Sequence, residues 1–375
     1  MTVNLYLMTF VLALALLWFG PRPALAVRIV GSKKARHWAL GLVSLVTLLA
    51  VSVAPVRADR TEADTVDSIL PFRYAWVKHD ESPVYEAPGD PAHMTPTRML
   101  HSSMWVSTER EVQVGEDVWY RIGEEAYVQA SHLWMAKPSP FHGILLEAAD
   151  RTPFGFVIGT DLNVRAKPGA ASSNPPVGQL EQYTVVDILD SVTAADGVWY
   201  RIGADRYVHS THIAAVTTMS RPEGVAVDEK WIAVNLAEQT LAAYEGDRMV
   251  YATLVSTGLP WWPTPEGLFQ IQRKLRHGDM SGRTADGEIY YLVQDVPWTM
   301  YFDGPYALHG AYWHNGFGYQ QSRGCVNLTP SDAKWLFDWS TPSVPGGERT
   351  VNAGKDDPGT WVYVYNVPAE TSLHS

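Results

Sequence analysis

Cys325 is the single cysteine in a chain of 375 residues, and His309 precedes it by sixteen positions. A thiolate is a good nucleophile, and a neighbouring imidazole can take the thiol proton. Gly324 comes directly before the cysteine, and a glycine there lets backbone N–H groups approach a developing oxyanion. A lone cysteine can also be a small buried apolar side chain, but this one lies in a polar, glycine-flanked segment. The pattern therefore predicts acyl transfer, with Cys325 as nucleophile and His309 as base.

Aromatic side chains are frequent between and before these two residues. Residues 311–319 would form the wall of a cleft and exclude water, and Trp313 and His314 are candidate substrate contacts within this run. Further candidates for the lining are Tyr290, Tyr291, Trp298, Met300, Phe302 and Tyr312, most of which we expect to pack in the core.

The segment resembles a known family. His309-Gly310, followed by Ser322-Arg323-Gly324-Cys325-Val326-Asn327, is similar to the signature of L,D-transpeptidase (YkuD-type) catalytic domains, a family that cross-links bacterial peptidoglycan. Residues 256–258, 264–267 and 296–300 resemble earlier landmarks of the same domain. The resemblance covers about residues 224–366, and we expect the catalytic domain at residues 224–367.

The resemblance implies a reaction and roles for the site residues. Cys325 attacks a tetrapeptide stem between its third residue, a diamino acid, and the terminal D-alanine. His309 moves the proton and is oriented by the backbone carbonyl of Gly310, and no cofactor is required. The N–H groups of Gly324 and Cys325 serve as oxyanion donors, while Ser322 and Asn327 hold the loop or contact substrate.

The acyl-enzyme has two possible fates. A side-chain amine of a second stem would complete an L,D-transpeptidase reaction, whereas water would make the enzyme an L,D-carboxypeptidase. The same residues serve both outcomes. The resemblance further implies that carbapenem β-lactams acylate Cys325.

Arg323 stands where the family usually has histidine. A guanidinium beside a thiol favours the thiolate, and it could hold a substrate carboxylate through two hydrogen bonds. An orientation toward solvent is the alternative. His309 remains the predicted base in either case.

Two hypotheses from other classes stay open. A zinc hydrolase could use His309, His314 and Cys325, with His277 as a further ligand, since these residue types suit zinc. A catalytically silent protein could instead bind the cell wall through the repeats described next.

Residues 118–123, Val-Trp-Tyr-Arg-Ile-Gly, recur as residues 198–203 at an offset of 80, and His132 matches His212 in the same register. A shared register of this length indicates duplication. Short runs broken by Pro, Gly and Asp predict small β-strands, and the pattern resembles bacterial SH3-like modules, which often bind cell-wall peptide or glycan. We expect module 1 at residues 74–137 and module 2 at residues 154–217. Either they bind the wall or they are spacers with Trp119 and Trp199 as core residues.

The first 58 residues differ from the rest. Apolar runs at residues 3–19 and 38–53 flank a basic segment, and the second run ends at Val56-Arg57-Ala58, which approximates a signal cleavage site. We expect a signal peptide or a membrane anchor, so that residues 59–375 lie outside the cytoplasm, in the cell envelope or wall. A true start near Val27 is one interpretation; two membrane passes are another, because each run is close to the minimum of about 17–20 residues.

Overall we expect a mainly β protein, with two small SH3-like β-barrels followed by a β-sandwich-like L,D-transpeptidase catalytic domain that has one or two short helices. Residues 331–339 form the clearest helix, with Thr329 as cap, Pro330 at the first position and Asp332 in a capping-box-like pattern. The predicted strands cover residues 231–236, 240–244, 248–256, 268–271 and 360–365, and the predicted linkers cover residues 59–70, 137–153 and 217–222. A net charge of −11 argues against nucleic acid as a partner.

Overall fold

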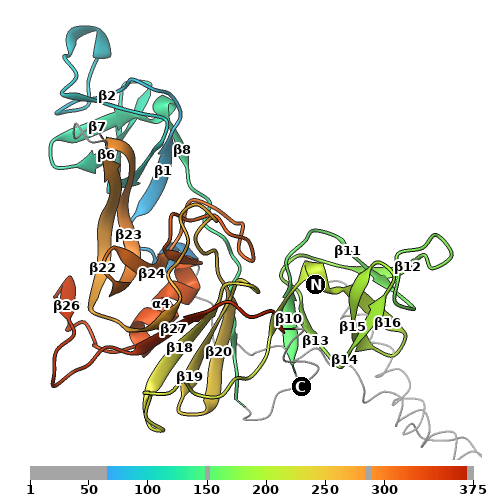
Figure 1. Ribbon diagram of the computed structural model, residues 1–375. Helices are drawn as coiled ribbons and strands as arrows, with labels where there is room; N and C mark the ends of the chain where they lie inside the picture. The colour runs from blue at the N-terminus through green and yellow to red at the C-terminus, as the bar shows by residue number, and fades with distance from the viewer. Residues whose placement is uncertain (1–65, 148–152, 284–288, 370–375) are drawn as a thin grey trace, which may run out of the picture. The chain divides into compact units, whose positions relative to one another are not determined.

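The computed structural model describes residues 66–147, 153–283 and 289–369. The chain divides into two units, Met1–Asp59 and Arg60–Ser375, and every described residue lies in the second. The described residues are mainly β-strand, with two α-helices, α3 (Val66–Ile69) and α4 (Pro330–Trp339) (Figure 1). The signal-peptide and anchor predictions concern residues 1–58, which lie outside the described residues. Within the described ranges, no helix combines the length and apolar character needed to cross a membrane.

The first repeat, called repeat 1 (residues 73–135), contains eight short strands and two 3-10 helices. They are β1 (Arg73–Val77), β2 (Ser82–Val84), η1 (Pro91–His93), β3 (Arg98–Leu100), β4 (Met104–Thr108), β5 (Arg110–Val114), β6 (Asp117–Gly123), β7 (Ala126–Gln129), η2 (Ala130–His132) and β8 (Leu133–Met135).

Repeat 2 (residues 154–216) has the same succession of strands. They are β10 (Phe154–Val157), β11 (Leu162–Arg165), β12 (Pro176–Leu180), β13 (Val185–Asp187), β14 (Asp190–Ala194), β15 (Gly197–Gly203), β16 (Arg206–His209) and β17 (Ile213–Val216), with η3 (Ser210–His212) before β17.

The strand pairing of the two repeats also agrees. Trp119 pairs with Gln129 as Trp199 pairs with His209, and each long central strand has an irregularity at the same place, after Arg121 and after Arg201. The duplication predicted from the sequence is therefore a duplication of structure. The assignment of the repeats as SH3-like barrels stays a prediction.

The segment between the repeats was predicted to be a linker, and this prediction is wrong in part. β9 (Ile144–Leu145) pairs antiparallel with β20 at the edge of a C-terminal sheet. Phe141 and Leu146 are buried in the core beneath that sheet. This segment is part of the C-terminal domain, because Phe141 and Leu146 are buried in its core and Ile144 and Leu145 pair with its edge strand. The predicted linker at residues 59–70 likewise ends in the one-turn helix α3.

The C-terminal domain (residues 230–365) begins with an antiparallel meander. Its first sheet has the order β21-β27-β18-β19-β20-β9. The bounds are β18 (Lys230–Asn235), β19 (Thr240–Glu245), β20 (Arg248–Leu254), β21 (Gly267–Gln270) and β27 (Trp361–Tyr365). A tight turn at Gly246, with φ +60°, joins β19 to β20. The strands predicted here are confirmed within one or two residues at most ends.

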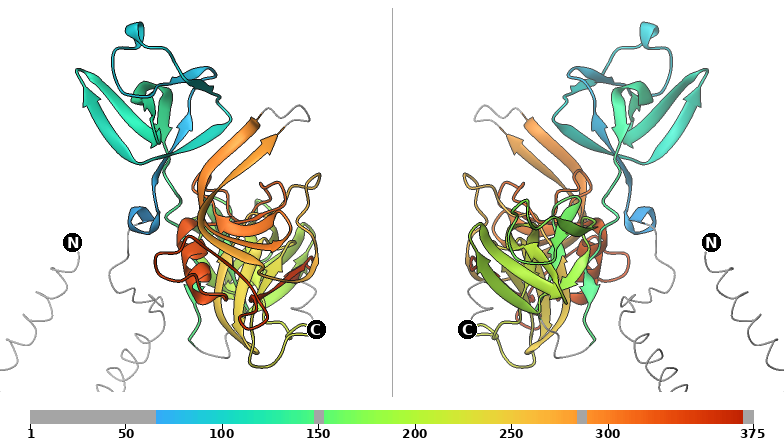
Figure 2. Two further views of the ribbon diagram at one scale, coloured as in Figure 1. Left: turned by 90° about the vertical axis from the view of Figure 1, so that its left-hand side faces the viewer. Right: turned by 90° about the vertical axis from the view of Figure 1, so that its right-hand side faces the viewer.

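The second sheet carries the candidate site. Its strands in this domain are β22 (Arg273–Arg283), β23 (Ile289–Asp303), β24 (Tyr306–Gly310), β25 (Val326–Leu328) and β26 (Thr350–Asn352). The long β22–β23 hairpin stands out from the body of the domain in both views of Figure 2 (orange). The N-terminal half of β23 pairs parallel with β4 of repeat 1, and β1 and β8 continue the sheet. Three strands of repeat 1 thus extend the sheet that holds the site.

The main core lies between these two sheets. It combines Ile232 and Val234 of β18 with Met300 of β23 and Leu336 of α4, among other apolar side chains. The other face of the first sheet packs against Phe156 and further apolar residues of repeat 2. Both repeats are therefore packed against the C-terminal domain.

Helix α4 begins with the predicted Thr329 cap, but Asp332 does not complete the predicted capping box, because its carboxylate accepts hydrogen bonds from the Gly143 N–H and the Tyr251 hydroxyl. The Thr329 side chain accepts a hydrogen bond from the Asp332 N–H, and Pro330 occupies the first turn. Ala333, Leu336 and Phe337 are buried, which confirms the predicted inward face. The helix follows β25 directly and so fixes the C-terminal side of the loop that carries Cys325.

Candidate active site

Cys325 lies in the loop that joins β24 to β25, one residue before β25. Its side chain is partly exposed, and Sγ donates a 3.8 Å hydrogen bond to the carbonyl of Pro305. The backbone of Ala307 also contacts the thiol. The sulfur therefore lies against the start of β24, the strand that carries His309.

Residues 256–259 hold the cysteine loop at both ends. Ser256 and Asn327 exchange two backbone hydrogen bonds of 2.9 Å. At the other end, the Ser322 N–H donates to the carbonyl of Thr257, and the Ser322 carbonyl accepts from Leu259, each at 3.0 Å. The Ser256-Thr257-Gly258 landmark thus has a structural part, because it fixes the two ends of the loop formed by residues 322–327.

The Ser322 hydroxyl fixes the inside of this loop. It donates a 2.5 Å hydrogen bond to the carbonyl of Cys325 and accepts a 3.1 Å bond from the Gly324 N–H. Ser322 therefore holds the loop, one of the two roles predicted for it. The Gly324 N–H, predicted as an oxyanion donor, is already engaged by Ser322 in this structure.

Gly324 is required by the backbone. Its φ is +108°, and a Cβ at this position would lie 2.4 Å from Cε1 of Tyr306. An L-residue with a side chain would be strained by its dihedral angle and would collide with the ring. Glycine therefore lets Cys325 approach β24.

His309 lies near the end of β24 and pairs in register with Asn327 on the parallel strand β25. Paired residues of adjacent strands point to the same face of a sheet. The His309 side chain is 2% exposed, and its ring lies 5.6 Å from the Trp313 ring, measured between centroids. The base candidate is thus held in a fixed, nearly dry position.

Gly310 is the residue whose carbonyl was predicted to orient His309. Burial lowers the pKa of His309 to about 4, against a smaller opposing effect of the Gly310 carbonyl. The carbonyl is therefore beside the ring, although Nδ1 of His309 is buried without a hydrogen-bond partner of normal geometry among the described residues.

Nucleophile and base are both uncharged at neutral pH. Although part of the Cys325 side chain is exposed, the desolvated surroundings of its sulfur raise the pKa of the thiol to about 11, while burial lowers that of His309 to about 4. A preformed thiolate–imidazolium pair is disfavoured, because each pKa unit corresponds to about 1.4 kcal/mol. The site therefore suits general-base catalysis, in which the proton moves as the sulfur attacks.

His314 and Asn327 support the loop. The Asn327 side-chain amide and Nε2 of His314 are 3.0 Å apart, and Nδ1 of His314 accepts a hydrogen bond from the Gly316 N–H at 3.2 Å. Both imidazole nitrogens are thus occupied by protein groups. Burial lowers the pKa of His314 to about 4, so the ring is neutral. These contacts favour positioning of the loop over the predicted substrate contact.

Arg323 projects from the loop between two aromatic rings. Its guanidinium carbon lies 5.1 Å from the centroid of the Trp262 ring and 4.4 Å from that of Tyr291 on β23. Both distances suit cation–π contacts. The guanidinium joins the cysteine loop to the β22–β23 hairpin, a role that neither sequence alternative anticipated.

The residues predicted as cleft lining divide into a buried group and a partly exposed group that contains Tyr291 and Trp313, while the side chain of Tyr290 lies outside the described residues. Trp298, Met300, Phe302 and Tyr312 are buried, and the first three belong to the main core. Trp261 and Trp262 were missed, yet their side chains are 67% and 47% exposed. The available signal in the sequence was Pro263 directly after them, since proline is typical of turns.

The described residues contain no group of side chains that would support the zinc hypothesis. Within residues 66–147, 153–283 and 289–369, no three His, Cys, Asp or Glu side chains lie close enough together to hold a metal ion. His277, its fourth candidate ligand, forms a 2.7 Å hydrogen bond through Nδ1 with the Asp295 carboxylate.

In a comparison with known protein families, residues 229–364 match the model of the YkuD family, described as the L,D-transpeptidase catalytic domain. The chain is 32% identical over 133 residues to L,D-transpeptidase 1 of Mycobacterium tuberculosis, covering 33% of this chain and 52% of that protein. The chain thus spans about half the length of the curated relatives it matches.

Solved structures give similar matches. The NMR structure of the catalytic domain of an Enterococcus faecium L,D-transpeptidase is 26% identical, covers 38% of this chain and all of that chain, and has a TM-score of 0.29. A crystal structure of an L,D-transpeptidase from Stackebrandtia nassauensis is 28% identical, covers 38% of this chain and 58% of that chain, and has a TM-score of 0.26. The family model and the curated relatives together support an L,D-transpeptidase catalytic domain at residues 229–364.

Proposed function

We propose that this protein is a peptidoglycan L,D-transpeptidase that works through a thioester on Cys325. The observation that carries the proposal is the placement of Sγ against Pro305 and Ala307, on the strand that two residues later carries His309. The proposed base lies on β24 and the proposed nucleophile one residue before its partner strand β25, within the segment that matches the family model.

The first half-reaction forms the acyl-enzyme. Sγ of Cys325 attacks the carbonyl of the diamino acid in a tetrapeptide stem, and the thiol proton passes to His309. The carbon–nitrogen bond to the terminal D-alanine then breaks, and His309 returns the proton to the leaving amine. D-alanine is released and a thioester remains on Cys325.

The second half-reaction regenerates the thiol. A side-chain amine of a second stem attacks the thioester and gives up a proton to His309, the carbon–sulfur bond breaks, and the proton returns to Cys325. Attack by water in place of the amine would release a tripeptide, which is the carboxypeptidase alternative. The proposed substrate lies outside the cytoplasmic membrane, so export through the apolar N-terminal segment is part of the proposal.

Mass spectrometry of residues 60–375 with a carbapenem tests the nucleophile. We expect a single covalent adduct on the wild type, none on Cys325→Ala, and slow formation on His309→Gln. A folded wild-type protein that forms no adduct, or an adduct that persists in Cys325→Ala, would contradict the proposal.

Incubation with a tetrapeptide stem separates the two outcomes. Chromatography of the products with and without a diamino-acid acceptor would show either a cross-linked dimer or a tripeptide. We expect the dimer to predominate when the acceptor is present. Tripeptide alone at all acceptor concentrations would establish the carboxypeptidase reaction.

A further inference from the structure

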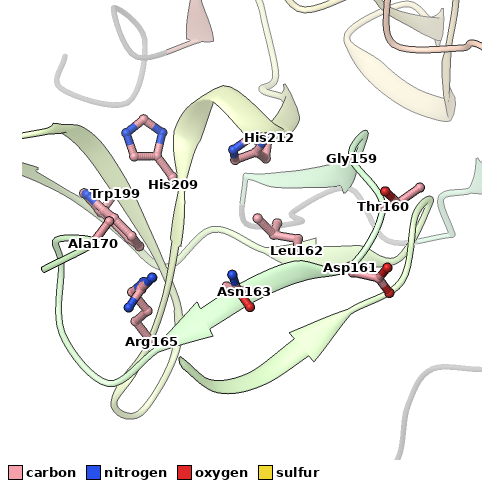
Figure 3. A pocket seen from close by; sticks show the side chains of 10 residues that line it. All are labelled: Gly159, Thr160, Asp161, Leu162, Asn163, Arg165, Ala170, Trp199, His209 and His212. Atoms are coloured by element: carbon pink, nitrogen blue, oxygen red, sulfur yellow. The ribbon is translucent and has the colours of Figure 1, made fainter. Parts of the chain in front are cut away.

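Repeat 2 contains a pocket that the chemistry of Cys325 does not use (Figure 3). Its volume is about 260 Å³, just below the range of about 300–1,000 Å³ typical of small-molecule sites. It lies between β11, β15 and β16. The lining residues are Gly159, Thr160, Asp161, Leu162, Asn163, Arg165, Ala170, Trp199, His209 and His212.

The two aromatic rings that line the pocket, those of Trp199 and His209, are held in place by hydrogen bonds. Nε1 of Trp199 donates to the Asp196 carboxylate at 3.0 Å. Nε2 of His209 bonds the Asp196 carbonyl at 2.9 Å, and its Nδ1 bonds Oγ1 of Thr211 at 2.9 Å. Both imidazole nitrogens of His209 therefore have protein partners. A ligand in the pocket would meet only the fixed face or edge of this ring.

Repeat 1 provides an internal comparison, because Tyr85 occupies the position of Arg165. Tyr85 pairs with Tyr127 as Arg165 pairs with Tyr207, which establishes the equivalence. The buried Tyr85 ring packs edge-on against Trp119, with 5.5 Å between centroids. In repeat 1 an aromatic ring thus packs on the tryptophan, whereas in repeat 2 the equivalent Trp199, although only 2% exposed, lines the pocket.

A second position shows the same contrast. A Cβ on Gly89 of repeat 1 would lie 2.8 Å from the sulfur of Met94, whereas a Cβ on the equivalent Gly169 would meet nothing within 4 Å. The loop at Gly169, which also carries the lining residue Ala170, is therefore less crowded in repeat 2 than its counterpart in repeat 1. The duplication has kept the fold and opened a site in one copy.

The charges of the pocket are separated. In Figure 3 the guanidinium of Arg165 lies near Trp199 at one end, and the carboxylate of Asp161 lies beside Thr160 at the other, with Asn163 between them. Arg165 uses one of its five donors on the Asn174 carbonyl, which orients the group. A guanidinium binds a carboxylate well, and a carboxylate binds an ammonium group.

We propose that this pocket binds a short zwitterionic peptide, with its carboxylate at Arg165 and its amino group at Asp161. Repeat 2 is then the ligand-binding copy, while repeat 1, whose equivalent position is filled, extends the catalytic sheet. The proposal is independent of acyl transfer at Cys325.

The probe is trialanine with free ends, compared with its N-acetyl derivative and its C-terminal amide. Binding to residues 60–375 carrying Cys325→Ala, which prevents turnover, is followed by NMR shifts and calorimetry. We expect trialanine to shift the amide signals of Asn163, Arg165 and His212, and each blocked derivative to bind at least about tenfold more weakly.

Arg165→Tyr introduces the residue that the sister repeat accommodates in the same strand register, so the fold is expected to survive. We expect it to abolish binding, while Arg206→Gln, which removes an exposed arginine of the same repeat outside the pocket, leaves binding unchanged. A Kd above about 10 mM for trialanine, equal affinity for all three peptides, or unchanged binding to Arg165→Tyr would overturn the proposal.

Discussion

The ring of Tyr74 in repeat 1 stacks on the ring of Tyr312, with 3.6 Å between centroids and 13° between the ring planes. Tyr312 in turn meets Trp313 edge-on at 5.0 Å, and Trp313 lies beside His309. The Tyr74 hydroxyl also donates a 2.8 Å hydrogen bond to the carbonyl of Asp295 on β23. A continuous set of ring contacts therefore leads from repeat 1 to the proposed base.

Tyr74→Ala should destabilise the protein and slow acylation. Removing a buried aromatic side chain costs about 3–5 kcal/mol, and loss of the stack releases Tyr312 behind Trp313. Urea unfolding and carbapenem acylation rates of residues 60–375 measure the two effects. Tyr74→Phe is the control, since it keeps the ring and loses only one hydrogen bond, worth about 1 kcal/mol. Identical unfolding and acylation in Tyr74→Ala and wild type would show that the stack is inconsequential.

Gly324→Ala should damage the cysteine loop. The dihedral strain and the collision with Tyr306 together cost of the order of 1–3 kcal/mol, which we expect as a roughly 5–150-fold slower acylation. Gly346→Ala is the matched control, because a Cβ there meets nothing within 4 Å. Acylation of Gly324→Ala at the wild-type rate would refute the steric account of this loop.

Local patterns in the sequence predicted the local structure well. The meander β18–β20 and the start of α4 were readable because alternation, a Gly-Asp turn and a Thr-Pro cap act between near neighbours. The parallel pairing of Leu292 with Met104 was not readable. It joins segments far apart in the chain, and no local periodicity specifies which distant edge a strand will meet.

The site was predictable in its reactive residues and less so in its supports. Cys325 and His309 could be proposed from residue type and spacing, and the structure places His309 on β24 and Cys325 one residue before the neighbouring strand β25. Outside the site, Lys274 was missed because lysine is almost never fully buried, yet its side chain is wholly inaccessible and contacts the end of α4. The difference between Tyr85 and Arg165 could have been noticed in the sequence, since the two residues occupy the same position of the repeat.

The acylation rate should be insensitive to pH over an unusually wide acidic range. His309 acts as a base only when neutral, and its pKa is lowered to about 4 by burial. The rate should therefore hold from about pH 8 down to about pH 5 and fall only as the pH approaches 4, whereas an ordinary histidine would lose its base form near pH 6.5. Stopped-flow acylation across this range tests it, and a half-maximal rate near pH 6.5 would contradict the lowered pKa.

Lys274 should make the protein more stable at alkaline pH. Its Nζ is buried against the end of α4, donating to the carbonyls of Phe337 at 2.5 Å and Ser340 at 2.8 Å. Burial lowers its pKa to about 8, below the value of about 10.4 in the unfolded chain. Between these values the unfolded state binds more protons, so the free energy of unfolding should rise with pH, by up to about 3 kcal/mol in total.

Urea unfolding from pH 7.5 to 10.5 measures this rise, and Lys274→Met identifies its source. The variant cannot titrate at this position, so its free energy of unfolding should lack the rise that Lys274 contributes. Lys355→Met, which removes an exposed lysine, should keep the wild-type profile. Parallel profiles for the wild type and Lys274→Met would mean that Lys274 titrates alike in the folded and unfolded states, and that its hydrogen bonds to the end of α4 offset the cost of burying its charge.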